Sequence, residues 1–355
     1  MKLLITGVCG FVGSALAECL LERLEGLTIW GVDNLMRPGS EANRPRLRRL
    51  GVAFVHGDIR SAGDVEALPD VDWVIDAAAN PSVLAGVAGG GTSRQLLEHN
   101  LGGMIHVLEF CKRSHAGLIV LSSSRVYSIA ALAGLPLRDT GEAFALDETA
   151  PLPRGVSAAG VRAEFSTDAP VSLYGSTKLA SEILALEYGA AFDFPVWVNR
   201  CGVLAGPGQF GTPEQGIFAF WVNGHLRRRP LKYIGFDGMG KQARDALHPA
   251  DLTRLIVREI ADGRRGGRRL YTAGGGPANT MSLRQLNAWC DARFGPHAPA
   301  SDLRSRPYDI PWIAMDNSAA QRDFGWAPAI SLDENLCRIA AHAEEHPDWL
   351  ERSGV

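Results

Sequence analysis

The stretch KLLITGVCGFVG, residues 2–13, decides the fold of this 355-residue chain. Residues 2–5 form an apolar run typical of a short buried strand, and residues 11–24 carry apolar side chains at helical spacing. The turn between them is a GxxGxxG motif, in which Gly7 permits a sharp turn, Gly10 lets the backbone approach a pyrophosphate, and Gly13 lets the helix pack on the strand. The helix N-terminus at Phe11 and Val12 offers free N–H groups to phosphates. The stretch therefore predicts a dinucleotide-binding unit.

Strand and helix patterns alternate beyond this unit. Further apolar runs occupy residues 27–32, 52–55, 73–75, 118–121 and 196–199, and helical patterns occupy residues 95–111 and 179–188. This alternation predicts an α/β protein with a Rossmann-type, doubly wound parallel sheet. Small or polar residues follow the strands, and such sheets bind ligands beyond the carboxyl ends of their strands.

The alternation loosens after residue 200. We therefore expect an NAD-binding Rossmann domain over residues 1–200 and a smaller C-terminal α/β domain, mainly substrate-binding, over residues 201–355. Some segments of the second part are expected to return to the first. Residues 128–170 show little periodicity, so we interpret them as a loop insertion of the kind that forms a lid, a binding loop or a disordered segment.

Composition excludes several classes of protein. The 36 Lys and Arg residues are balanced by 39 Asp and Glu residues, which argues against binding to nucleic acid. Glycines and Glu18 interrupt the apolar N-terminal stretch, so neither a signal peptide nor a membrane span is expected. The six cysteines include no CxxC pair, which indicates a reduced, cytoplasmic protein, and with no HExxH motif we expect no catalytic metal.

Asp33 points to the cofactor. It ends the second strand, 20 residues past Gly13, where a carboxylate accepts hydrogen bonds from the adenine ribose and repels the 2′-phosphate of NADP. NAD is therefore expected, although Arg37 leaves NADP open. Asp58 follows the third strand and is expected at the adenine edge. The other expected cofactor contacts are Asn34, Ile59, the small residues Ala77, Ala78 and Ala79, Asn100, Ser122 and Arg200.

Tyr174 and Lys178 form a YxxxK motif at the start of a predicted helix. The i, i+4 spacing puts both side chains on one helical face. A neighbouring ammonium group and a positive nicotinamide ring favour the phenolate of a tyrosine, which can then take a hydroxyl proton. Lys178 can also hold the nicotinamide ribose. The motif predicts an oxidoreductase-type site, in which a residue of Ser122-Ser123-Ser124 orients the substrate hydroxyl.

These motifs together resemble the extended short-chain dehydrogenase/reductases that modify nucleotide sugars, over nearly the whole chain. In that family the catalytic Ser or Thr lies four residues before the tyrosine of a VYG-like turn, here Val126-Tyr127-Ser128. The resemblance therefore implies that Ser123 is catalytic and that Ser122 contacts the cofactor. Family members that act as 4,6-dehydratases carry Asp-Glu directly after the catalytic residue. This chain has Ser124-Arg125, so dehydration is not expected.

The chain, and its second half most sharply, resembles the CDP-paratose 2-epimerase (tyvelose epimerase) branch of that family. The resemblance rests on residues 209–216 (QFGTPEQG), on residues 240–248 (GKQARDALH), and on the DNL-x-R-x-GS pattern at residues 33–40. It implies that Arg244 and Arg306 bind a diphosphate. The remaining expected substrate contacts are Ser124, Arg125, Cys201, Gln209, Phe210, Gln215 and Gln242.

The resemblance implies an NAD-dependent nucleotide-sugar epimerase. It would oxidise its substrate transiently to a keto sugar and reduce it again on the other face, with C2 of a CDP-hexose as the favoured site. A UDP-hexose 4-epimerase and a UDP-uronate decarboxylase remain alternatives within the family. A non-enzymatic NAD-binding regulator of this fold would be expected to lack one of the catalytic residues. Ser123, Tyr174 and Lys178 are all present, so such a regulator is not expected. The resemblance also implies a homodimer, formed by the helices over residues 95–111 and 179–188.

Overall fold

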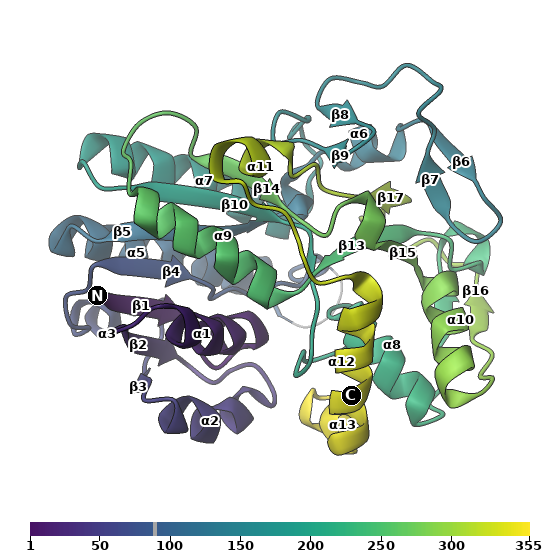
Figure 1. Ribbon diagram of the computed structural model, residues 1–355, viewed down its shortest axis with the longest axis horizontal. Coiled ribbons are helices and arrows are strands. Elements are labelled where there is room, and N and C mark those ends of the chain that lie inside the picture. The colour runs from purple at the N-terminus through teal and green to yellow at the C-terminus, as the bar shows by residue number, and fades with distance from the viewer. Residues whose placement is uncertain (88–90) are drawn as a thin grey trace.

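The computed structural model describes residues 1–87 and 91–355 and contains a seven-stranded, fully parallel sheet (Figure 1). The strands lie in the order β14-β10-β5-β4-β1-β2-β3. Their bounds are β1 Lys2–Thr6, β2 Thr28–Asp33, β3 Ala53–His56, β4 Trp73–Asp76, β5 Gly117–Ser123, β10 Val196–Cys201 and β14 Leu270–Ala273. The order reverses beside β1, as in a doubly wound fold, and the expected fold class is confirmed.

Helices cover both faces of this sheet. Side chains alternate along β1, so Leu3 and Ile5 pack toward one face while Leu4 packs toward the other. Because both faces are buried, the strands are mostly apolar, and their polar residues lie mainly toward the carboxyl ends of β5 and β10. One face carries α1 (Phe11–Arg23), α9 (Pro249–Asp262) and α11 (Ser318–Phe324), and the other carries α3 (Ala62–Glu66), α5 (Gly103–Ser114) and α7 (Ser172–Ala191).

The chain leaves the first sheet at Gly202, between β10 and β11, and builds a second core. A four-stranded sheet combines β11 (Val203–Leu204), β13 (Ala243–Leu247), β15 (Thr280–Ser282) and β17 (Trp312–Ile313). Beside it lie α8 (Ile217–Leu226), α10 (Leu283–Phe294), α12 (Leu332–Glu345) and α13 (Trp349–Arg352), with the pair β12 (Lys232–Ile234) and β16 (Ala300–Asp302). Between these segments, α9 and β14 return to the first sheet.

Residues 128–170 form ordered structure where we expected an aperiodic insertion. They contain α6 (Ile129–Ala133), the antiparallel pair β6 (Leu137–Asp139) and β7 (Phe144–Leu146), and the pair β8 (Val156–Ser157) and β9 (Gly160–Val161). Isolated apolar residues anchor this segment: Leu132, Leu146 and Phe165 are buried against Ile310 and Trp312. Because these apolar residues pack against parts of the chain far away in sequence, they do not recur at the spacing of a helix or a strand within the segment.

Further helical elements include α2 (Arg44–Arg49), α4 (Ser93–Leu97) and the π-helical turn η2 (Glu98–Gly102). Short 3-10 helices are η1 (Ser40–Asn43), η3 (Ser124–Val126), η4 (Phe236–Gly238) and η5 (Pro277–Asn279). Within residues 1–87 and 91–355, no helix is sufficiently long and apolar to cross a bilayer.

Candidate active site

The glycine turn packs directly against the end of β4. Gly7 has a φ of +64°, and a Cβ atom there would lie 2.8 Å from the Cα of Ala78. A Cβ on Gly13 would lie 2.2 Å from the carbonyl oxygen of Gly7, so only glycine lets α1 approach the turn. No side chain caps the first turn of α1, which leaves its N–H groups free for phosphates. The turn fits a bound dinucleotide.

Asp33 holds this turn from the end of β2. Its carboxylate accepts hydrogen bonds from the backbone N–H groups of Cys9 (2.9 Å) and Leu35 (2.8 Å). Burial raises the pKa of this carboxyl above its ordinary value. Two N–H donors leave lone pairs for ribose hydroxyls. The side chain of Arg37 is directed elsewhere: it donates to Gln215 Oε1 (2.8 Å) and to the carbonyl of Phe210 (3.0 Å).

The other expected adenosine contacts cluster at the ends of β2 and β3. Asn34 Nδ2 donates to Asp58 Oδ2 (3.0 Å), and Arg60 forms an ion pair with the same carboxylate (2.6 Å). Ile59 is buried, and Ala77, Ala78 and Ala79 follow β4. Because Asn34 and Arg60 already bind the carboxylate of Asp58, we expect the backbone N–H and carbonyl groups of residues 58 and 59 to bind the adenine edge.

Asn100 connects the end of β4 to the catalytic helix. It lies in the π-helical turn η2, accepts a hydrogen bond from the N–H of Asn80 (2.8 Å), and donates to Thr177 Oγ1 on α7 (3.2 Å). The expected cofactor contact therefore also positions the helix that carries Tyr174 and Lys178.

The helix that carries the expected Tyr174 and Lys178 packs against the carboxyl end of β5, where the expected Ser123 lies. Tyr174 and Lys178 lie on α7 and are buried, and Lys178 Nζ donates to the carbonyl of Leu121 (3.0 Å) near the end of β5. Ser123 is the last residue of that strand. A Cβ on Gly175 would lie 2.2 Å from the carbonyl oxygen of Arg125. The glycine therefore lets α7 come close enough to bring Tyr174 beside the segment that follows Ser123.

A buried ion pair behind the site was not expected from the sequence. Glu182, on α7, forms an ion pair with Arg200 (2.7 Å) and accepts a hydrogen bond from the hydroxyl of Ser122. Arg200 Nη1 also donates to the carbonyl of Ala163 (2.8 Å). The polar groups of Ser122 and Arg200 thus face Glu182. Glu182 follows Lys178 at helical spacing, and that spacing was the one signal for it in the sequence.

Three arginines expected near the substrate lie on or against the segment 306–310. Arg125 and Arg244 contact residues 308–310, and Arg306 belongs to the segment itself. Arg244 Nη2 forms an ion pair with Asp309 (2.9 Å), and burial lowers the pKa of Arg244 to about 10. Arg125 Nη1 donates to the carbonyl of Tyr308 (3.1 Å), and Arg306 donates to the carbonyl of Pro213 (3.1 Å). These side chains form a basic centre that suits a diphosphate.

Other expected substrate residues surround this centre. Gln242 Nε2 donates to the carbonyl of Ile234 (3.0 Å) and reaches Asp309. Ser124 is buried beside Arg125 and shares a narrow cavity with it. Cys201 is buried too, and burial raises the pKa of its thiol to about 12, which makes it a poor nucleophile.

Three residues expected in the nucleotide pocket also contact other parts of the protein. Gln215 is bound by Arg37, and Phe210 stacks on Trp349 of α13 with ring centroids 5.3 Å apart. The indole N–H of Trp349 donates to the carbonyl of Gln209 (2.8 Å). We call Arg37, Phe210, Gln215 and Trp349 the Arg37 cluster. It joins the loop after Asp33 to the second core and to α13.

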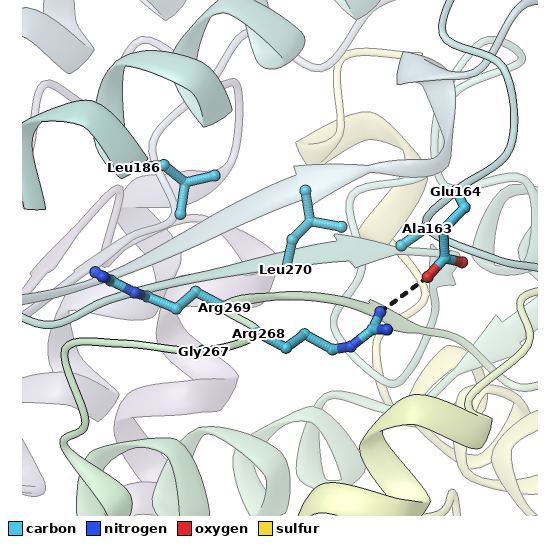
Figure 2. A pocket seen from close by; sticks show the side chains of 7 residues that line it. All are labelled: Ala163, Glu164, Leu186, Gly267, Arg268, Arg269 and Leu270. Atoms are coloured by element: carbon cyan, nitrogen blue, oxygen red, sulfur yellow. Dashed lines mark hydrogen bonds and ion pairs between the residues drawn. The ribbon is translucent and has the colours of Figure 1, made fainter. Parts of the chain in front are cut away.

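A larger cavity lies away from these residues. Its volume is about 370 Å³, and it is found beside the edge strand β14, next to Leu186 of α7. Figure 2 shows Arg268 pointing toward Glu164, with which it forms an ion pair (3.0 Å), while Arg269 points the opposite way. None of the expected site residues lines this cavity.

The described part of the chain contains no group of three or more His, Cys, Asp or Glu side chains arranged to hold a metal ion. His342 and His346 do occur at HxxxH spacing on and just after α12. Their rings stack with centroids 4.1 Å apart, and no third ligand accompanies them.

Comparison with known proteins agrees with this geometry. A model of the NAD dependent epimerase/dehydratase family matches residues 3–274. The chain is 29% identical to CDP-paratose 2-epimerase of Salmonella typhi over 96% of this chain and 98% of that protein. It is 26% identical to UDP-glucuronate 4-epimerase of Thermodesulfobacterium geofontis over 98% and 97% of the two chains. The fold matches UDP-glucuronic acid 4-epimerase of Bacillus cereus, solved with UDP-glucuronic acid and NAD, with a TM-score of 0.76 at 24% identity, covering 97% and 99% of the two chains.

Proposed function

Since this chain belongs to the NAD dependent epimerase/dehydratase family, we propose that it is a nucleotide-sugar epimerase that inverts C2 of a CDP-hexose. The observation that supports the proposal is that α7, which carries Tyr174 and Lys178, packs against the end of β5, where Ser123 lies. The Ser124-Arg125 pair that follows Ser123 supports epimerisation over dehydration, because it supplies no carboxylic acid for an elimination.

Each member of this triad has a distinct task. Ser123 orients the reacting hydroxyl, and Tyr174 removes its proton. Lys178 stabilises the phenolate by its positive charge and holds the ribose of the nicotinamide. Bound NAD supplies the reversible acceptor for the hydride that leaves the same carbon. The keto sugar then turns its other face to the same residues, the hydride returns to the carbon on that face, and Tyr174 gives the proton back to the oxygen.

The choice of CDP-hexose and C2 is supported by the residues that resemble the CDP-paratose 2-epimerase branch and by similarity to a protein of that name along nearly its full length. A UDP-uronate or UDP-hexose 4-epimerase is the second candidate, because a UDP-glucuronate 4-epimerase is similar over nearly as much of the chain. Incubation with CDP-, UDP-, GDP- and dTDP-sugars, followed by product NMR, distinguishes these candidates.

We also propose that the enzyme is a cytoplasmic homodimer. All six cysteines are free thiols in the described structure, which suits a reducing compartment. Three large apolar side chains are exposed on neighbouring helices: Leu97 on α4, Ile105 on α5 and Ile183 on α7. An apolar face of this kind can be buried by the same helices of a second copy.

Tyr174→Phe tests the mechanism because it keeps the ring and removes the proton acceptor. Turnover should fall by about 10²–10⁴-fold, while folding and NAD binding persist. Tyr188→Phe, on the same helix, is the matched control and should retain activity. A substrate deuterated at the reacting carbon should return the deuterium to that carbon. Full activity of Tyr174→Phe, or solvent deuterium at that carbon, would contradict the proposed mechanism.

A further inference from the structure

Arg125 links the catalytic residues to the basic centre. Its backbone N–H donates to Ser123 Oγ (3.1 Å), and its carbonyl lies against Gly175, the residue after Tyr174. Its guanidinium reaches the carbonyl of Tyr308 (3.1 Å), next to the Asp309 carboxylate that Arg244 holds. A single residue therefore connects the proton-transfer site, through its backbone, to the expected diphosphate site, through its side chain.

The positive charge of Arg125 lacks a dedicated counterion. A guanidinium has five N–H donors, and across residues 1–87 and 91–355 only a neutral carbonyl accepts from this one. The carboxylate of Asp309 is already bound by Arg244. Ser124, Tyr308 and Arg125 line one narrow cavity of about 10 Å³. Arg125 is partly buried, and such a cation is stabilised when a ligand brings an anionic group.

The covalent structure of a nucleotide sugar fixes where its anionic diphosphate lies relative to the reacting carbon. The diphosphate is attached to the anomeric carbon, C1, and C2 is the neighbour of C1. When the C2 hydroxyl is held by Ser123 and Tyr174, the β-phosphate must also be close to these residues. When C4 reacts, the sugar ring separates the diphosphate from Tyr174, and a neutral hexose places no charge beside Arg125.

We propose that Arg125 binds the β-phosphate next to the reacting carbon and thereby selects C2 over C4. This inference rests on the proposed epimerase function and adds a residue that determines its site of reaction. It also disfavours C4 epimerisation of a UDP-sugar whose hexose is uncharged, since C4 of such a sugar would bring no anion to Arg125.

Binding of CDP and CMP isolates the role of the β-phosphate. In NAD-loaded enzyme, Arg125→Gln should weaken CDP about tenfold or more and leave CMP, which lacks a β-phosphate, unchanged. Arg125→Lys should restore part of the affinity for CDP. Arg154→Gln, an exposed position, is the control and should alter neither ligand. Equal weakening of CDP and CMP would indicate a merely structural role, and unchanged CDP binding would also overturn the inference.

Isotopic labelling tests the reacting carbon directly. CDP-paratose carries a hydroxyl at both C2 and C4, so each carbon can be deuterated in turn and the formation of bound NADH followed in a single turnover. We expect a primary isotope effect with the C2 label and none with the C4 label. An effect with the C4 label, or turnover of UDP-glucuronate alone, overturns the selection of C2 and leaves the epimerase function intact. The absence of bound NADH with every nucleotide sugar would instead contradict the proposed function itself.

Discussion

At the scale of single residues, Glu259 of α9 is a carboxyl group without access to water. It accepts a hydrogen bond from Asn199 Nδ2 on β10 (2.9 Å), and its second oxygen has no partner among the described residues. The side-chain oxygen of Asn199 has none there either. Burial raises the pKa of Glu259 to about 8. A protonated carboxyl satisfies both orphan oxygens by donating to the amide oxygen, so Glu259 is neutral in the folded protein near pH 7.

This carboxyl should make stability depend on pH. Because the pKa of Glu259 is higher in the folded state, its contribution to stability is fully present below pH 4.5, the ordinary pKa of a glutamate. That contribution is lost as the pH rises through about 8, the pKa in the folded state. Between these values the free energy of unfolding should fall by up to about 1.4 kcal/mol per pH unit. Glu259→Gln, which keeps the shape and places an amide against Asn199, should remove that slope in urea denaturation. The exposed Glu345→Gln is the control, and identical slopes for wild type and Glu259→Gln would show that Glu259 is charged when folded.

At the scale of elements, the position of α7 depends on a glycine. A Cβ on Gly175 would lie 2.2 Å from the carbonyl oxygen of Arg125 and 3.3 Å from the Cβ of Val171, which leaves little room to relax. Gly175→Ala should displace the first turn of α7, with Tyr174, away from Ser123. A misplacement of about 1 Å can lower the rate about 10²-fold. Gly102→Ala, where the nearest atom would be 3.9 Å away, is the helical control; kcat and the melting temperature distinguish lost positioning from unfolding.

The same elements explain what the sequence can predict. The glycine turn, the apolar strands and the YxxxK spacing are local patterns, so the parallel sheet and the face of α7 could be inferred from them. The partners of Phe210 and Gln215 could not, because Trp349 and Arg37 lie far away along the chain. The contacts of Ser122 and Arg200 with Glu182 could not be inferred either, because they depend on how β5, β10 and α7 pack together. The ordered insertion at 128–170 is held by single anchors that have no period to detect.

At the scale of the whole molecule, the exposed apolar side chains of α4, α5 and α7 predict its assembly. Leu97, Ile105 and Ile183 are 41%, 42% and 56% exposed, and Tyr188 of α7 donates to Glu109 of α5 (2.7 Å), which keeps the helices adjacent. Ile183→Glu should convert a dimer into a monomer, because it buries an unpaired charge at the interface. Light scattering at micromolar concentration measures the mass. The exposed Leu303→Glu is the control, and a monomeric wild type would contradict the assembly.

The Arg37 cluster has a consequence for how α13 and the cofactor depend on each other. One end of the cluster belongs to the loop that begins at Asp33, and the other end is Trp349 of α13. A Cβ on Gly39 would lie 2.5 Å from the carbonyl oxygen of Arg352, so loop and helix fit together without spare room. If docking of α13 favours the loop conformation that binds NAD, then NAD must favour docking of α13 by the same free energy. Cofactor affinity and the equilibrium fraction of protein with α13 docked are then two measurements of a single coupling.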